Sequence, residues 1–126
     1  KIPRRSKNYS VNEAYVDSFP KGYKEYLDWA HQENYSSRYI GSMVADVHRT
    51  LLKGGVFLYP PTAQHTEGKL RLMYEANPMA MVIEQAGGKA INGDTRICEV
   101  PPTGLHQRTS VILGSTDEVN HVQRFL

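Results

Sequence analysis

The sequence has 126 residues, 40% of them hydrophobic and 22% charged, which suits one soluble domain with a real core. A net charge of +2 does not by itself indicate nucleic-acid binding. No apolar run reaches the roughly 18 residues of a membrane span. One cysteine, Cys98, excludes an internal disulfide and fits a reducing, cytoplasmic location. The chain opens at Lys1 without Met, so we expect it to be part of something longer.

The first half of the chain predicts two helices. After a basic arm over 1–10, apolar side chains at helical spacing indicate a helix over 20–33 and a clearer one over 41–53. Ser42 can cap the second helix and Gly54 ends it. The apolar side chains expected to face the core from this second helix are Val44, Val47, His48, Leu51 and Leu52.

Residues 68–78 predict a strand that runs into a helix. Side chains alternate along a strand, so alternate residues would share one face, with Lys69 and Glu75 about 20 Å apart at its ends. Asn77 and Pro78 would then begin the helix. A carboxylate at the C-terminal end of a strand sits where α/β proteins place ligands, although the same alternation also describes a solvated edge strand. The shared face would carry Lys69, Arg71, Met73 and Glu75.

The remainder alternates strands with helices. A short apolar strand over 56–59 precedes the central stretch, and a helix over 78–86 follows it, apolar nearly all round and therefore expected to be well buried. Short strands over 89–91 and 109–113 come next, with a further candidate strand over 96–100.

The last helix is expected over 116–126. Ser115 and Glu118 have the spacing of a reciprocal capping box at its start. Strands that alternate with helices predict an α/β fold, with helices on both faces of a layered sheet.

Side chains that could bind an anion or a sugar are scattered through the sequence. Phenols, amides and guanidinium groups are candidates because all of them donate hydrogen bonds to phosphate or hydroxyl groups. The backbone N–H groups of Gly41, Ser42 and Met43 form a candidate anion site at a helix start, although a plain buried helix has the same pattern. Glu75 is the one well-placed carboxylate. The scattered candidates are Asn12, Tyr15, Arg38, Tyr39, Tyr59, Lys69 and Arg71.

Several catalytic motifs are absent from the sequence: a serine nucleophile elbow, a Walker loop and a Cys/His pair. A two-metal phosphatase needs several carboxylates that converge on the metals. Glu75 alone could at most complete such a centre.

Three segments resemble class I fructose-1,6-bisphosphatase: 37–49 (SRYIGSMVADVHR), 57–60 (FLYP) and 68–80 (GKLRLMYEANPMA). Segments 84–88 (EQAGG) and 105–108 (LHQR) extend the resemblance, which covers nearly the whole chain and is to the C-terminal half of that enzyme. It implies that residues 1–126 are a single C-terminal, sugar-phosphate-binding domain. Its fold would be the three-layer α/β/α arrangement of the sugar phosphatases, with a central mixed sheet.

The resemblance implies how the sugar 6-phosphate end is held. Arg38 resembles the arginine that reaches the 6-phosphate of the neighbouring subunit, and Lys69 would contact both sugar and phosphate. The backbone of Gly41, Ser42 and Met43 would contact the sugar. The family motif usually has glycine where this chain has Ala14, which bears on the backbone beside Asn12. The 6-phosphate itself would be held by Asn12, Tyr15, Tyr39 and Tyr59.

At the 1-phosphate end, the resemblance makes Glu75 a magnesium-binding carboxylate, with Arg71 near it. The full-length protein would use Mg²⁺ to hydrolyse the 1-phosphate of fructose 1,6-bisphosphate, giving fructose 6-phosphate and phosphate in gluconeogenesis. It would be a cytoplasmic homotetramer with no nucleic-acid or membrane partner.

The family's other metal carboxylates, its catalytic loop and its AMP site lie in the half that has no counterpart here. The 126-residue chain alone is therefore expected to be inactive. Two alternatives stay open: a non-catalytic sugar-phosphate-binding or assembly module, and a relative that acts on sedoheptulose bisphosphate.

Overall fold

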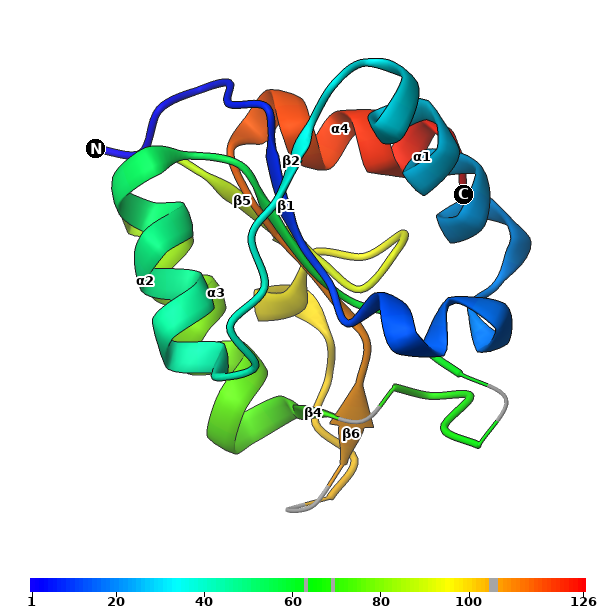
Figure 1. Ribbon diagram of the computed structural model, residues 1–126. Helices are drawn as coiled ribbons and strands as arrows, with labels where there is room; N and C mark the ends of the chain where they lie inside the picture. The colour runs from blue at the N-terminus through cyan, green and yellow to red at the C-terminus, as the bar shows by residue number, and fades with distance from the viewer. Residues whose placement is uncertain (63, 69, 105–106) are drawn as a thin grey trace.

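A five-stranded mixed sheet forms the centre of the computed structural model, which describes residues 1–62, 64–68, 70–104 and 107–126 (Figure 1). Its strands lie in the order β2-β1-β3-β7-β5. β1 pairs in parallel with β2 and β3, whereas β7 pairs antiparallel with β3 and β5. The strands are Asn8–Ser10 (β1), Ser36–Ser37 (β2), Val56–Tyr59 (β3), Lys89–Ile91 (β5) and Val111–Gly114 (β7).

Two pairs of helices cover the two faces of this sheet (Figure 1). α1 (Lys21–Gln32) and α4 (Thr116–Arg124) lie on one face, and α2 (Met43–Lys53) and α3 (Asn77–Gln85) lie on the other. The three-layer α/β/α arrangement confirms the predicted fold class. Within the described ranges, no helix combines the length and the apolar character that a membrane crossing needs.

The two central strands contribute to both cores because their side chains alternate between the faces. Leu58 and Ile112 pack in the core under α1 and α4, whereas Phe57 and Leu113 pack in the core under α2 and α3. All four side chains are at most 2% exposed. A short strand that is buried on both faces reads as a continuous apolar run, as 56–59 does.

The predicted strand over 68–75 is wrong beyond Arg71. β4 covers only Leu70–Arg71, and a π-helical turn, η2 (Leu72–Ala76), runs directly into α3. Leu72 is fully buried whereas Tyr74 is 51% exposed, yet a strand would place both on one face. Burial along one helical face therefore overrides the two-residue alternation. Because residues 72–76 are helical, the alternating strand face expected for Arg71, Met73 and Glu75 does not form, and Lys69 lies outside the described residues.

The start of α3 differs for the same reason. Asn77 has αR backbone angles and lies inside the continuous helical run, so it is not an N-cap. Pro78 does lie in the first turn of α3, as predicted. The expected strand over 96–100 is also wrong, because a 3₁₀ turn, η3 (Ile97–Glu99), occupies it.

The apolar faces predicted for α2 and α3 are only partly buried. Val47 is 3% exposed, but Val44 and Leu52 are 65% and 61% exposed, and His48 is also exposed. Met81 of α3 is 59% exposed. The helical layer formed by α2 and α3 thus carries apolar side chains on its outer side, where the sequence pattern led us to expect burial.

The predicted capping box at α4 does not form. Ser115 Oγ instead accepts the Gly55 N–H at 3.0 Å and donates to the Pro3 carbonyl at 2.6 Å. Glu118 Oε2 accepts the Ser6 N–H at 3.2 Å. Both side chains are buried and bind segments that are distant in sequence, because unpaired backbone groups of those segments meet them in the fold.

Stability should fall at alkaline pH through buried tyrosines. Burial raises the pKa of Tyr23 from 10.0 to about 12. The stability that this shift represents is complete below pH 10 and is lost as the pH rises towards 12, because the unfolded chain ionises first. Tyr23→Phe removes a titration worth at most ~2–3 kcal/mol, so its free energy of unfolding should fall less than that of the parent across this window.

Urea unfolding of both proteins on either side of that pH window measures the difference. Equal losses of unfolding free energy in the two proteins would show that Tyr23 does not carry the effect.

Candidate functional site

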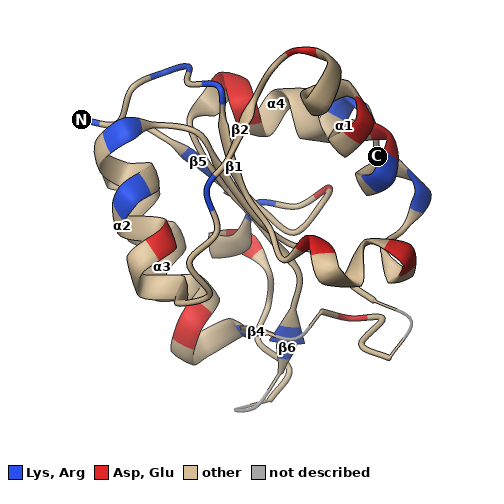
Figure 2. Ribbon diagram, viewed as in Figure 1, with Lys and Arg blue, Asp and Glu red and all other residues tan. Residues whose placement is uncertain are grey.

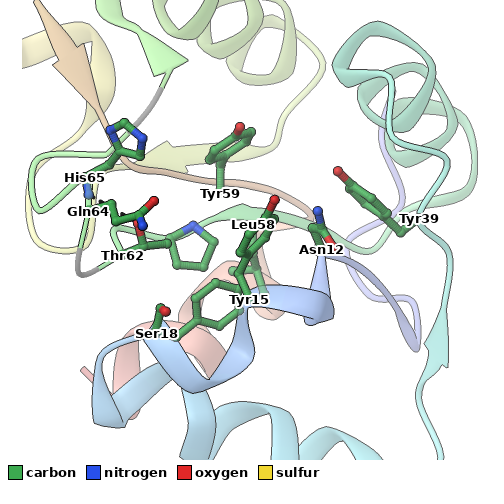
Figure 3. Close-up of a pocket in the computed structure, with 11 residues that line it drawn as sticks. Asn12, Tyr15, Ser18, Tyr39, Leu58, Tyr59, Thr62, Gln64 and His65 are labelled. Carbon is green, nitrogen blue, oxygen red and sulfur yellow. Dashed lines mark hydrogen bonds between the residues drawn. The ribbon is translucent and has the colours of Figure 1, made fainter.

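A pocket with a volume of about 190 Å³ opens at the C-terminal end of β3 (Figure 3). We call it the tyrosine pocket, because Tyr15, Tyr39 and Tyr59 line it together with Asn12. These four side chains come from three separate parts of the chain. In Figure 3 the Tyr39 side chain points towards Tyr59 and Asn12. The other lining residues are Ser18, Phe19, Leu58, Pro60, Thr62, Gln64 and His65.

Parallel pairing of β1 with β3 brings two walls of the pocket together, because the carboxyl ends of parallel strands meet at one edge of a sheet. Tyr59 is the last residue of β3, and Asn12 follows β1. Asn12 caps the 3₁₀ turn η1 (Glu13–Ser18), and its Oδ1 accepts the Ala14 N–H at 3.2 Å. Ala14 therefore lies within a capped turn, and the next residue, Tyr15, lines the pocket.

Two phenols of the tyrosine pocket, those of Tyr39 and Tyr59, have raised pKa values. Burial raises the pKa of Tyr39, and the negative charge of Asp46 adds to the rise. Burial also raises the pKa of Tyr59, with contributions from Tyr39 and Glu75. The Tyr39 and Tyr59 phenols therefore stay protonated at neutral pH and can donate their O–H groups to an anion.

Arg38 and the start of α2 adjoin Tyr39 in the chain but are not among the residues that line the tyrosine pocket. Arg38 is exposed, and its N–H donates to the Tyr9 carbonyl at 2.8 Å. Ser42 caps α2 as predicted, with its Oγ accepting the Ala45 N–H at 3.4 Å. Gly41, Ser42 and Met43 thus form the helix start beside Tyr39.

A second hollow shares Tyr59 with the first, and we call it the arginine pocket. Arg71, Glu75 and Arg108 line it, together with Leu70 and Tyr74. Arg71 and Arg108 stand opposite each other where β4 pairs with β6 (Arg108–Thr109). Figure 2 shows the cationic segments of these two strands next to the acidic turn that precedes α3. Lys69, expected to contact both sugar and phosphate, lies outside the described residues.

Glu75 fits as one ligand of a magnesium ion, but not as a complete site. Its Oε1 accepts the Arg71 N–H at 3.0 Å. Among the described residues, no three His, Cys, Asp or Glu side chains gather as a metal site would need. Magnesium is often held by one or two carboxylates plus water and phosphate oxygens. Glu75 could therefore supply one oxygen to an ion whose other ligands come from elsewhere.

Arg108 is a charged residue of the arginine pocket that sequence reasoning missed. Arg108 is the last residue of the 105–108 segment, which extends the family resemblance, so the sequence did contain a signal for it. Its position beside Arg71, however, depends on the antiparallel pairing of two strands of two residues each. Strands this short leave no alternation to detect. The loop residues Thr62, Gln64 and His65 were missed for a similar reason, since a polar loop resembles a solvated one until its fold is known.

The fold and these two hollows define a layered α/β domain with candidate ligand pockets at the end of a central strand. Residues 2–126 match the family model described as the C-terminal domain of fructose-1-6-bisphosphatase. The chain belongs to that family, which confirms the resemblance found in the sequence.

Its relatives are longer than the chain. The class 1 fructose-1,6-bisphosphatase of Chlorobium chlorochromatii is 55% identical to it, covering 98% of this chain and 39% of the relative. That of Cytophaga hutchinsonii is 53% identical, covering 100% and 38%. The crystal structure of Leishmania major fructose-1,6-bisphosphatase in holo form has a TM-score of 0.96 at 53% identity, covering 98% of this chain and 42% of that one. The chain thus spans about two fifths of these relatives.

The hydrogen bond from Arg71 N–H to Glu75 indicates that the Glu75 side chain stabilises the start of η2 independently of any metal. Glu75→Ala removes the acceptor and should cost about 1 kcal/mol of unfolding free energy, as the loss of a helix cap does. Glu75→Gln keeps an acceptor oxygen at the same position and should change stability by under about 0.5 kcal/mol. Urea unfolding of the two variants measures this, and equal losses would contradict the capping role.

Proposed function

We propose that the chain is the substrate-binding part of a fructose-1,6-bisphosphatase, and that the tyrosine pocket binds the 6-phosphate end of fructose 1,6-bisphosphate or fructose 6-phosphate. The observation that carries this proposal is the convergence of Asn12, Tyr15, Tyr39 and Tyr59 on one pocket in a member of this family. The same four residues are the ones that the family resemblance assigns to the 6-phosphate.

Neutral donors suit this task. Phenol O–H groups and an amide can direct several hydrogen bonds at one phosphate, and hydrogen bonds to a charged group are roughly twice as strong as those between neutral groups. The volume of about 190 Å³ accommodates a phosphate group and part of a sugar. Arg38 is exposed and outside the pocket wall, which is compatible with a role at the 6-phosphate of a neighbouring subunit in a tetramer.

The reacting 1-phosphate would lie towards the arginine pocket, which adjoins the tyrosine pocket through Tyr59. There Arg71 and Arg108 would bind phosphate oxygens, and Lys69 would contact the sugar and phosphate. Magnesium, when bound with the help of Glu75, would polarise the phosphoryl group and lower the pKa of the attacking water. Glu75 would orient its carboxylate through the hydrogen bond with Arg71 N–H.

A complete enzyme would need the part of the full-length family protein that this chain does not span. The exposed apolar side chains of α2 and α3 fit a contact with that part, and the lack of a metal-ligand cluster among the described residues fits a site completed by it. Cytoplasmic location and gluconeogenic use belong to the same proposal. The alternative, a non-catalytic sugar-phosphate-binding module, uses the same pocket without a reacting end.

The tyrosine pocket predicts that the chain binds fructose 6-phosphate and that Tyr59→Phe weakens this binding. A hydrogen bond to a charged group contributes about 1.5–3 kcal/mol, so the dissociation constant should rise roughly 10- to 100-fold. Isothermal titration calorimetry of the 126-residue chain measures both affinities.

Two controls define the result. Tyr23→Phe makes the same chemical change outside the tyrosine pocket and should leave the affinity unchanged, and fructose without phosphate should not bind measurably. If the parent chain shows no saturable binding, or if both Phe variants weaken it equally, the proposed phosphate site is wrong.

In a fructose-1,6-bisphosphatase of full family length that carries this domain, Glu75→Gln should cut kcat by about 10² or more and weaken activation by magnesium, because it removes a charge but preserves shape. Fructose 6-phosphate binding should survive, since the tyrosine pocket is untouched. Activity titrated against magnesium measures the effect. Superimposable curves for parent and variant would remove Glu75 from the reacting end.

A further inference from the structure

Asp46 is the carboxylate of α2, and two of its hydrogen-bond donors lie in the segment that precedes the helix. The residue is 1% exposed. Its Oδ1 accepts the Ile40 N–H at 3.0 Å, and its Oδ2 accepts the Gly41 N–H at 3.2 Å. A buried charge is costly unless it is paired and hydrogen-bonded, so both oxygens are committed to these contacts.

Arg49, one turn further along α2, completes the arrangement. Its guanidinium donates to Asp46 Oδ1 at 3.0 Å and also to Ser10 Oγ and to the carbonyl oxygen of Arg38. Ser10 Oγ donates to the same Arg38 carbonyl. Asp46 thus accepts the N–H groups at one end of the 38–41 segment, while Arg49 donates to the carbonyl at its other end.

The segment that this pair holds is irregular and exposed. It follows β2 and precedes α2, and its Ile40 side chain is 65% exposed while Gly41 has a φ of +96°. Such a segment has little packing of its own to fix it. It nevertheless carries Tyr39, which lines the tyrosine pocket, and Arg38.

Helix capping does not account for these contacts. The start of α2 is capped by Ser42 Oγ, which accepts the Ala45 N–H, so Asp46 is not needed as the N-cap. The carboxylate reaches back past the helix start to the preceding segment. The negative charge of Asp46 also helps to raise the pKa of Tyr39, which indicates that the carboxylate lies close enough to influence the phenol.

We propose that Asp46 and Arg49 are positioning residues for the 6-phosphate site: together they fix the backbone of residues 38–41 so that Tyr39 is preorganised to donate to a phosphate. Neither residue touches the ligand in this proposal. The inference rests on the proposed function, because the benefit of a fixed Tyr39 is realised only when a phosphate binds in the tyrosine pocket. Preorganised donors bind more tightly because less motion is lost on binding.

The experiment compares two variants of the pair with a packing control in the 126-residue chain. Asp46→Asn retains one acceptor oxygen but loses the charge and the second acceptor, and Arg49→Gln removes the guanidinium fork. Val47→Ala removes buried volume from the same helix without touching the pair. Thermal unfolding by circular dichroism establishes a temperature at which each protein is folded, and calorimetry at that temperature gives the dissociation constant for fructose 6-phosphate.

Both pair variants should weaken fructose 6-phosphate binding roughly tenfold or more, because small displacements of a positioned group have effects of this size. Amide hydrogen exchange at Ile40 and Gly41 should accelerate in the same variants. Val47→Ala should bind like the parent despite its lower stability. Arg49 is partly exposed, so Arg49→Gln tests the proposal even if Asp46→Asn does not fold.

The outcomes separate the two proposals. If the parent chain does not bind fructose 6-phosphate, the proposed function fails and this inference fails with it. If the parent binds and the folded pair variants bind equally well, the positioning role is overturned while the phosphate site stands. If Val47→Ala weakens fructose 6-phosphate binding as much as the pair variants do, Asp46 and Arg49 have only a general structural role.

Discussion

The pairing of β3 with β7 is the contact on which the rest of the structure depends. It is antiparallel and places Val56 opposite Gly114 and Tyr59 opposite Val111. Gly114 has a φ of +145°, and a Cβ at this position would lie 2.1 Å from the Gly55 carbonyl oxygen. Only glycine allows so close an approach of the two backbones. Because β3 also pairs with β1, this register fixes the centre of the sheet. It also sets which side chains of the central strands face each of the two helical layers.

The location of both pockets follows from the position of β3. Its last residue, Tyr59, lines the tyrosine pocket and the arginine pocket, so the two hollows adjoin at the end of the central strand. One is lined by neutral donors and the other by two guanidinium groups and a carboxylate. An elongated ligand with a phosphate at each end would match this division, and the proposed bisphosphate substrate is such a ligand.

Buried polar side chains hold the irregular segments around this frame. Ser115 binds the backbone at Gly55 and Pro3, and Glu118 binds Ser6 N–H. Asp46 binds the segment that carries Tyr39. In each case the side chain lies at or near the start of a helix but serves a distant or preceding stretch of backbone. Burial makes these hydrogen bonds effective because little water competes for the same donors and acceptors.

The sequence by itself determined the layered α/β fold, since helical and strand periodicities and the cap at Ser42 depend on neighbouring residues. It also identified, through family resemblance, four of the side chains that line the tyrosine pocket: Asn12, Tyr15, Tyr39 and Tyr59. Tertiary structure alone decided that the chain turns helical at Leu72, because burial of that side chain against the core outweighs local alternation. It likewise decided the partners of Ser115 and Asp46 and the meeting of Arg71 with Arg108, since these contacts join backbone or side chains whose proximity depends on the packed fold.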